Sequence, residues 1–257
     1  MLHKLNSIQY PSLIDHANAH DCGSVYPLSV VEGIQEGDIF TDSVQEYDKV
    51  LFWAHSGFAY LSGNIDEHFL EDTYEFMLDR AKTNTKRFLL MTRNRYIQEY
   101  FEAKNDVIEE KRYLFEYSEA KGYIEPSLPE GYELKEIDDR LLKQISGEIV
   151  PSLFWNDAND FLIKGKGYCI TCNNDIASWA FSAAVSTKET DIGIETKPEY
   201  KQQGLGMIVA NKMIQYTIQQ EKEPVWACHY KNTASEKMAE KLGFIKVSEC
   251  SVIKRKY

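Results

Sequence analysis

Apolar and polar positions follow two different periods along this chain. Residues 132–137 alternate as a half-buried strand does, whereas apolar residues recur at helical spacing across 204–220. Applied to the whole second half, these rules predict a strand, two helices, three strands, and then helix, strand, helix and strand. The expected strands are 132–137, 167–173, 176–186, 190–197, 224–229 and 245–254; the expected helices are 139–150, 155–164 (a helix or turn), 204–220 and 233–242.

The first half of the chain has a related pattern. It predicts a hairpin over 48–53 and 58–61, a helix over 67–81, a strand over 88–91, a helix over 95–103 and a strand over 112–115. Two prolines and two glycines within Gly122–Gly131 predict a boundary, which gives domains 1–125 and 126–257. We therefore expect a mixed α/β (α+β) fold whose smaller first domain is a degenerate relative of the second.

The turn before the 204–220 helix is rich in glycine and glutamine. A short apolar run, Ile192–Ile194, precedes the segment Pro198-Glu-Tyr-Lys-Gln-Gln-Gly-Leu-Gly206. A strand, a glycine turn and a helix N-terminus together present backbone N–H groups to an anion. Gly204 and Gly206 remove side chains where a phosphate has to approach the main chain. The segment predicts a pyrophosphate cradle, and an ordinary strand-to-helix turn closed by glycine is the alternative.

Two motifs in this half resemble those of the GNAT superfamily of acetyl-CoA-dependent N-acyltransferases. Lys201-Gln-Gln-Gly-Leu-Gly206 is similar to its Arg/Gln-x-x-Gly-x-Gly/Ala motif. Asn232 opens a predicted helix that ends in Lys241-Leu-Gly-Phe244, at the distance from the first motif that the superfamily shows. The predicted order of helices and strands is also that of the superfamily.

A narrower resemblance covers most of the chain. Ile194–Tyr200, Trp226-x-Cys228 and the predicted hairpin Leu51–Gly63 are similar to a two-domain bacterial GNAT group that includes zwittermicin A self-resistance acetyltransferases. Such groups diversify their acceptors, so the likeness does not specify a substrate. The loop 62–68 in the first half carries no Gly-x-Gly, which predicts one cofactor site per chain.

The resemblance implies acetyl-CoA (coenzyme A) as cofactor. Main-chain donors of residues 202–207 and the dipole of the following helix would hold the pyrophosphate, and Glu195 and Thr196 would offer main-chain hydrogen bonds to the thioester carbonyl. Splaying of strands 190–197 and 224–229 would admit the pantetheine arm. The implied cofactor-binding residues are Thr196, Lys201, Gln202, Gln203, Gly204, Leu205, Gly206, Met207, Asn232 and Ser235. Helix capping alone is the alternative for Asn232.

An amine must lose a proton before it can attack, and a carboxylate can take that proton directly or through water. Glu195 is the first candidate base because it lies beside the expected acetyl position; Asp191 and His229 follow. The alternatives are a solvated strand charge and a water relay. Ala239 stands where the superfamily commonly has a tyrosine that protonates the departing thiolate. The substitutes considered for that acid are Tyr230, Cys228 and Ser235.

Composition excludes some classes of protein and leaves others open. The 257 residues carry a net charge of −11, and residues 1–125 hold 12 Lys and Arg against 22 Asp and Glu. This acidity disfavours a nucleic-acid partner; it serves solubility or steers a cationic amine toward the site. No apolar run is long enough to span a bilayer, and the N-terminus lacks the apolar core of a signal peptide. We expect a cytoplasmic protein without a membrane partner.

Two clusters of metal-binding residue types occur, and neither predicts a metal site. Cys169 and Cys172 are three apart in an expected strand and so face opposite sides. His16 and His20 share a helical spacing near Cys22, but surface or capping histidines are favoured.

The function that these observations predict is acetyl transfer to a primary amine of a small molecule, such as an antibiotic or metabolite, in a ternary complex. The alternatives are a non-catalytic acyl-CoA-binding module and a protein-lysine acetyltransferase. A homodimer is a further expectation. The first domain would wall the acceptor pocket with Trp53, His55 and Tyr60, unless these aromatic residues only pack its core.

Overall fold

The computed structural model describes residues 1–83, 87–118 and 126–256. Its internal contacts group the chain into two units. The first unit comprises Met1–Leu114, Cys228–Lys231 and Val247–Tyr257, and the second comprises Phe115–Ala227 and Asn232–Lys246. The predicted boundary segment, 122–131, lies partly outside the described residues, so the division at residue 125 stays a prediction.

The second unit has its elements in the predicted order. Its strands are β7 (Tyr132–Glu136), β8 (Gly167–Cys172), β9 (Asp175–Val185), β10 (Glu189–Thr196), β11 (Glu223–His229) and β12 (Phe244–Arg255), the last two contributing residues to both units. Its helices are α5 (Asp139–Leu142), η2 (Pro151–Leu153), α6 (Ala158–Lys164), η3 (Pro198–Tyr200), α7 (Leu205–Gln219) and α8 (Thr233–Lys241).

The predicted helix over 139–150 was wrong in length, because α5 ends at Leu142. Asp138 caps its start by accepting a hydrogen bond from the backbone N–H of Leu141 at 2.7 Å. Further along, the backbone N–H of Ile149 donates to the carboxylate of Glu195 and not to a helical carbonyl. A tertiary contact that captures this amide competes with helix formation, and hydrophobic spacing does not reveal it.

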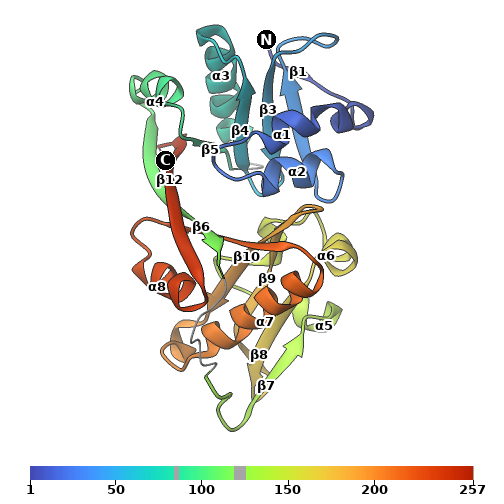
Figure 1. Cartoon of the computed structure of the whole chain (residues 1–257), viewed down its shortest axis with the longest axis vertical. Helices are drawn as coiled ribbons and strands as arrows, with labels where there is room; N and C mark the ends of the chain where they lie inside the picture. The colour runs from blue at the N-terminus through green and yellow to red at the C-terminus, as the bar shows by residue number, and fades with distance from the viewer. Residues whose placement is uncertain (84–86, 119–125, 257) are drawn as a thin grey trace. The chain divides into compact units, whose positions relative to one another are not determined.

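Strands β11, β10, β9, β8 and β7 follow one another in the sheet of the second unit. β10 is antiparallel to β9 and parallel to β11. α7 packs against β8, β9 and β10, as Figure 1 shows for the orange helix. Phe181 and Gly193 are register partners on β9 and β10, and the rings of Phe154 and Phe161 lie against Phe181. Gly193 allows this packing, because a Cβ there would stand 2.8 Å from the Phe181 ring.

The first unit repeats the order of elements found in the second. It contains β1 (His3–Lys4), η1 (Ser7–Leu13), α1 (Ile14–Asn18), α2 (Val25–Val31), β2 (Gly37–Thr41), β3 (Lys49–Ala54), β4 (Phe58–Gly63), α3 (Glu67–Thr83), β5 (Leu89–Thr92), α4 (Arg95–Glu102) and β6 (Val107–Tyr117), which extends into the second unit. The hairpin, the two later helices and their strands were predicted. The elements before residue 48 were not, because their apolar residues are buried without a clear period.

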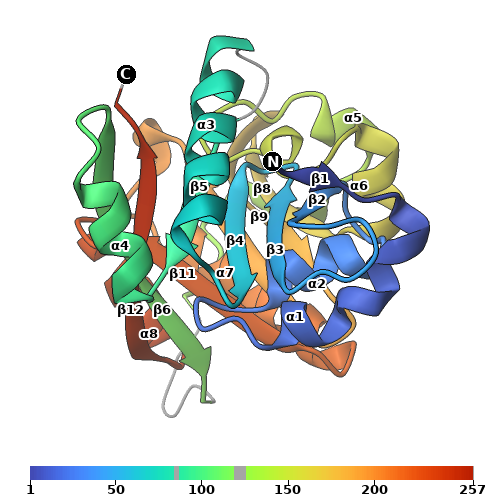
Figure 2. The same ribbon diagram turned by 90° about the horizontal axis from the view of Figure 1, so that it is seen from above.

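Two layers of helices pack on β3 and β4. Phe69 and Met77 of α3 share a buried cluster with Leu51 and Leu61, whereas Tyr26 of α2 contacts the rings of Phe58 and Tyr60. Figure 2 shows α3 beside β4, and α1 and α2 below the same strands.

The last strand of the chain completes the sheet of the first unit. Ser251–Ile253 of β12 pair antiparallel with Leu90–Thr92 of β5, and Ile253 belongs to the buried cluster of that unit. The strand order there is β1, β2, β3, β4, β5 and β12. Among the described residues, no helix combines the length and apolarity that crossing a bilayer requires.

Candidate functional site

Strands β10 and β11 pair only at their beginnings. The parallel ladder joins Glu189–Asp191 to Glu223–Val225 and ends there. On its other edge, β10 has a register shift against β9 between Asp191 and Ile192. A bulge of this kind bends a strand, so it explains why the ladder stops at that residue. The separation predicted for these two strands is present, and within the described ranges it leaves the β11-facing edge of β10 without a ladder partner beyond Asp191.

The turn that follows β10 presents a series of unpaired backbone donors. Gln202 and Gly204 have positive φ angles of 64° and 78°, and Gly204 is the N-cap of the 15-residue helix α7. The backbone N–H groups of residues 202–206 have no hydrogen-bond acceptor within the described ranges. Such groups at a helix N-terminus attract an anion. The geometry therefore fits a pyrophosphate, as the sequence predicts for this turn.

Gly206 contributes to the turn in a different way from the one expected. A Cβ on Gly206 would stand 3.0 Å from Met238 Cε and 3.2 Å from Thr196 Oγ1. The missing side chain therefore allows α7 to pack closely on β10 and α8, and a role of Gly206 beside a phosphate stays a prediction. Gly204 is the glycine that the backbone conformation requires, because its φ is one that side chains strain.

Side chains from neighbouring strands hold the turn in place. Asp175, at the start of β9, accepts hydrogen bonds from Lys197 Nζ at 2.6 Å and Tyr200 Oη at 3.1 Å. The hydrogen bond from Lys197 lowers the pKa of Asp175. Tyr132 of β7 donates to Gln203 Oε1 at 2.9 Å. The sequence gives no sign of these supports, since they depend on which strands are neighbours.

Thr196 and Glu195 both make tertiary contacts. The Ser178 hydroxyl lies 2.7 Å from Thr196 Oγ1 and donates to the Glu195 carbonyl at 3.1 Å. The Glu195 carboxylate accepts a hydrogen bond from the backbone N–H of Ile149 at 2.7 Å. Glu195 is therefore an anchored side chain, not the freely solvated strand charge that was the alternative.

The other candidate bases lie in different surroundings. Asp191 is buried at the bulge of β10. His229 ends β11 in the segment grouped with the first unit, together with Cys228 and Tyr230. Its Nε2 lies 3.7 Å from Glu110, and its ring contacts that of Tyr230. The catalytic roles of these residues stay predictions.

Asn232 and Ser235 form the start of α8. Asn232 Oδ1 accepts the N–H of Ser235 at 3.1 Å, so Asn232 is the helix N-cap. The Ser235 hydroxyl accepts a hydrogen bond from Trp226 Nε1 at 3.1 Å. Ala239 is fully buried one turn further on. Capping thus accounts for Asn232, and contacts to a pantetheine arm stay predictions.

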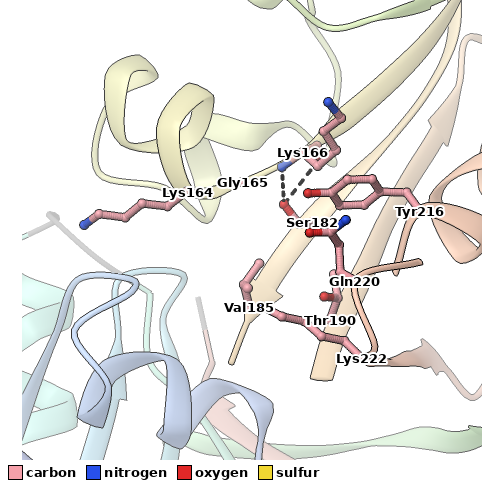
Figure 3. A pocket seen from close by; sticks show the side chains of 9 residues that line it. All are labelled: Lys164, Gly165, Lys166, Ser182, Val185, Thr190, Tyr216, Gln220 and Lys222. Carbon is pink, nitrogen blue, oxygen red and sulfur yellow. Dashed lines mark hydrogen bonds between the residues drawn. The ribbon is translucent and has the colours of Figure 1, made fainter. Parts of the chain in front are cut away.

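A small cavity lies at the other end of β10. Its volume is about 50 Å³, and its lining includes Ser182, Thr190 and Tyr216. Figure 3 shows the Lys164 and Lys166 ammonium groups pointing away from it. Thr190 and Thr196 are six residues apart, about 20 Å along a strand, and nucleotide-sized ligands need pockets of about 300 Å³ or more. This cavity is therefore separate from the glycine turn.

His16 and His20 do not share a helix face, because only His16 lies in α1. α1 ends at Asn18, and His16 Nδ1 lies 3.0 Å from the Ser62 hydroxyl. His20 is beyond the helix, where its Nδ1 accepts the N–H of Cys22 at 3.2 Å. The side-chain ligand atoms of His20, Asp21 and Cys22 lie within 4.8 Å of one another, and the His20 side chain is only 5% exposed. The expectation of a surface histidine was therefore wrong for His20, while that of a capping role fits its bond to Cys22.

Trp53 and Tyr60 lie in the interior of the first unit. Both side chains are buried, and Trp53 Nε1 donates to the carbonyl of Arg87 at 3.2 Å. For these two residues, the structure agrees with the core-packing alternative. His55 is partly exposed, and its Nδ1 lies 4.0 Å from Glu36.

The separated strands and the amides of residues 202–206 are the features that the sequence analysis expects of an acyl-CoA site. The sequence profile of the GNAT acetyltransferase family matches residues 21–253, and the chain belongs to this family. It is 24% identical over 257 residues to the uncharacterized N-acetyltransferase YdfB of Bacillus subtilis (strain 168), covering 98% of each chain. The protein is thus an acyltransferase of the EC 2.3.1 type, and enzymes of its family generally use acetyl-CoA.

Solved structures show the same fold. A GCN5-related N-acetyltransferase-like protein from Streptococcus suis 89/1591 superposes with a TM-score of 0.75 at 21% identity, covering 98% of this chain and 100% of that one. A tandem GNAT protein from the clavulanic acid biosynthesis pathway gives 0.65 at 11% identity, covering 99% and 98%. The tandem neighbour agrees with the repeated order of elements in the two units.

Proposed function

We propose that this protein transfers the acetyl group of acetyl-CoA to a primary amine of a small molecule, and that the second unit performs the reaction. The observation that carries this proposal is the run of N–H groups at residues 202–206, soon after β10. Among the residues that the structure describes, these groups have no acceptor, and β10 has no ladder partner on that edge beyond Asp191. Bound acetyl-CoA supplies the acetyl group as an activated thioester.

Different residues of the chain bind the cofactor and orient the reacting groups. The amides of residues 202–206 and the N-terminus of α7 hold the pyrophosphate, and Lys201, which is exposed, adds a positive charge nearby. The main chain of Glu195 and Thr196 orients the thioester carbonyl at the free edge of β10. The amine reaches this position neutral, after a carboxylate or a water has taken its proton. The net charge of −11 favours a cationic amine. A cytoplasmic location and a homodimer remain predictions.

The test combines binding with turnover on the full-length protein. Calorimetric titration with acetyl-CoA should give a stoichiometry near one, and thiol release should depend on an amine from a panel of small primary amines. Two equivalent sites would refute the assignment of binding to the second unit alone. Release only with lysine-containing peptides would point to a protein substrate.

A non-catalytic acyl-CoA-binding module is the second candidate. The buried Ala239 favours it, since relatives in the superfamily commonly have a tyrosine acid at that point. Saturable acetyl-CoA binding without thiol release on any amine or peptide would support the module and contradict the enzyme.

A further inference from the structure

A loop between α5 and η2 is fastened to β10 through the carboxylate of Glu195. Oε2 of Glu195 accepts the N–H of Ile149 at 2.7 Å. A Cβ on Gly147 would stand 2.5 and 2.6 Å from the two carboxylate oxygens, closer than side-chain carbons come. Glycine at 147 thus allows the loop to approach the carboxylate, and the hydrogen bond to Ile149 holds it there.

A residue of β9 binds the backbone carbonyl of Ile149, the same loop residue whose N–H Glu195 binds. Trp179 Nε1 donates to the carbonyl of Ile149 at 2.8 Å. Trp179 on β9 is the register partner of Glu195 on β10, so both side chains project from the same face of the sheet. The side chains of Ile194 and Thr196 face α7 instead, because both lie close to Gly206 in the first turn of that helix. The loop Gly147–Ile149 therefore covers the sheet face opposite α7.

The fastening point adjoins the candidate acetyl position. Glu195 lies four residues beyond Asp191, where the ladder to β11 ends, and directly before Thr196. An amine that approaches an acyl group at this strand edge from the side opposite α7 meets the loop. A carboxylate has about four lone-pair sites, so the hydrogen bond to Ile149 does not by itself prevent proton transfer. Both oxygens nevertheless face the loop, since Oε2 accepts the N–H of Ile149 and a Cβ on Gly147 would stand within 2.6 Å of each. The loop therefore lies between the carboxylate and an approaching amine.

We propose that Glu195 is a positioning residue, which holds the loop Gly147–Ile149 as a wall of the amine site, and that it is not the general base. This inference rests on the proposed function and deepens it, because it assigns the loop a part in binding the acceptor. The carboxylate of Glu195 makes no bond to the acetyl group or to the amine; only its main chain lies at the acetyl position.

The test depends on the difference between accepting a hydrogen bond and accepting a proton. In Glu195→Gln the amide oxygen can still accept the N–H of Ile149, but it cannot serve as a base near neutral pH. We expect kcat within about threefold of wild type and an unchanged pH profile. If Glu195 were the general base, Glu195→Gln would lower kcat roughly 100-fold and the loss would shrink at high pH. That result would overturn the proposal.

Gly147→Ala tests the wall from the side of the loop. The new methyl displaces the loop from Glu195, so KM for the amine should rise at least tenfold while the Kd for acetyl-CoA stays unchanged. Glu195→Ala should have the same effect. Gly167→Ala is the matched control, because its Cβ would stand 2.6 Å from Ile137 Cδ1 in the same unit, away from Glu195. It should lower the melting temperature without changing the KM for the amine.

The outcomes separate this inference from the proposed function. If Gly147→Ala leaves the KM for the amine unchanged in a protein that turns over, the wall is refuted and the enzyme stands. If the wild-type protein releases no thiol with any acceptor, both are refuted. An equal rise of KM in Gly147→Ala and Gly167→Ala would reduce the effect to general destabilisation and would also overturn the inference.

Discussion

The two units use the same sequence of elements around a helix and differ at the N-terminus of that helix. In the first unit, β4 pairs in parallel with β5 over Phe58–Tyr60 before α3 begins. In the second, β10 pairs in parallel with β11 over Glu189–Asp191 before α7 begins. Both strands therefore part from their neighbour after three residues. A splayed strand pair alone does not make a cofactor site.

The difference lies in what satisfies the first amides of each helix. Asp66 Oδ1 accepts the N–H of Phe69 at the start of α3, and Lys49 pairs with the same carboxylate at 3.2 Å. That hydrogen bond to the Phe69 N–H lowers the pKa of Asp66. At α7 the corresponding place is Gly204, which has no side chain, and the amides of residues 202–206 are unpaired among the described residues. The first unit thus carries its own anion where the second leaves room for one. This contrast supports one cofactor site per chain.

Moving the aspartate from one helix to the other should produce the largest effect. Gly204→Asp places a carboxylate at the N-cap of α7, where it competes with the pyrophosphate. We expect the Kd for acetyl-CoA to rise at least 100-fold, about 2.7 kcal/mol, as measured by calorimetry. Gly204→Ala is the control for backbone strain and for crowding against Pro126, 3.1 Å from the new Cβ, and it should cost less than tenfold. Equal losses in both variants, or an unchanged Kd, would contradict the cradle.

In the first unit, the buried His20 should make the free energy of unfolding depend on pH, although it takes no part in cofactor binding. Burial lowers the pKa of His20 to about 4, from an ordinary value of 6.5. Between these values the unfolded chain binds more protons than the folded chain, so stability falls as the pH falls. Lowering the pH from 6.5 to 5 should remove about 1.5 kcal/mol of the free energy of unfolding.

Denaturant titrations at the two pH values measure this loss. His20→Asn should remove most of the pH dependence between 5 and 6.5. His68→Gln is the matched control, because the His68 side chain is 82% exposed, and it should keep the wild-type dependence. A stability that is flat from pH 6.5 to 5 in the wild type would contradict a buried neutral His20.

Two alanine substitutions, one in each unit, should give the smallest effects. They should show that the second unit affects cofactor affinity and the first affects only stability. Asp175→Ala releases Lys197 and Tyr200, which hold the turn before α7, so the Kd for acetyl-CoA should rise about three- to tenfold. Asp66→Ala removes the N-cap of α3 and should lower the free energy of unfolding by about 0.5 to 1 kcal/mol, with the Kd unchanged. A higher Kd for acetyl-CoA in Asp66→Ala would show that the first unit takes part in cofactor binding.

Periodicity and local chemistry predicted most of the second unit. The helix over 204–220 and the strand over 190–197 agree with α7 and β10 within two residues, because a helix and a half-buried strand each repeat at their own period. The glycine turn was also predictable, since only a residue without a side chain adopts the φ of Gly204 readily. Elements whose residues are buried on several sides, such as α2, lack a periodic signal and were missed.

The sequence by itself determined the order of elements in the second unit, the family and the position of the glycine turn, because each depends on residues that are neighbours along the chain. Only the tertiary structure decided what Glu195 contacts, why Gly206 is a glycine and which residues support the turn. Glu195 meets Ile149, Gly206 meets Met238, and Asp175 meets Tyr200. These partners lie 46, 32 and 25 positions away along the chain, and the pairing of strands and the packing of α7 on the sheet bring them together.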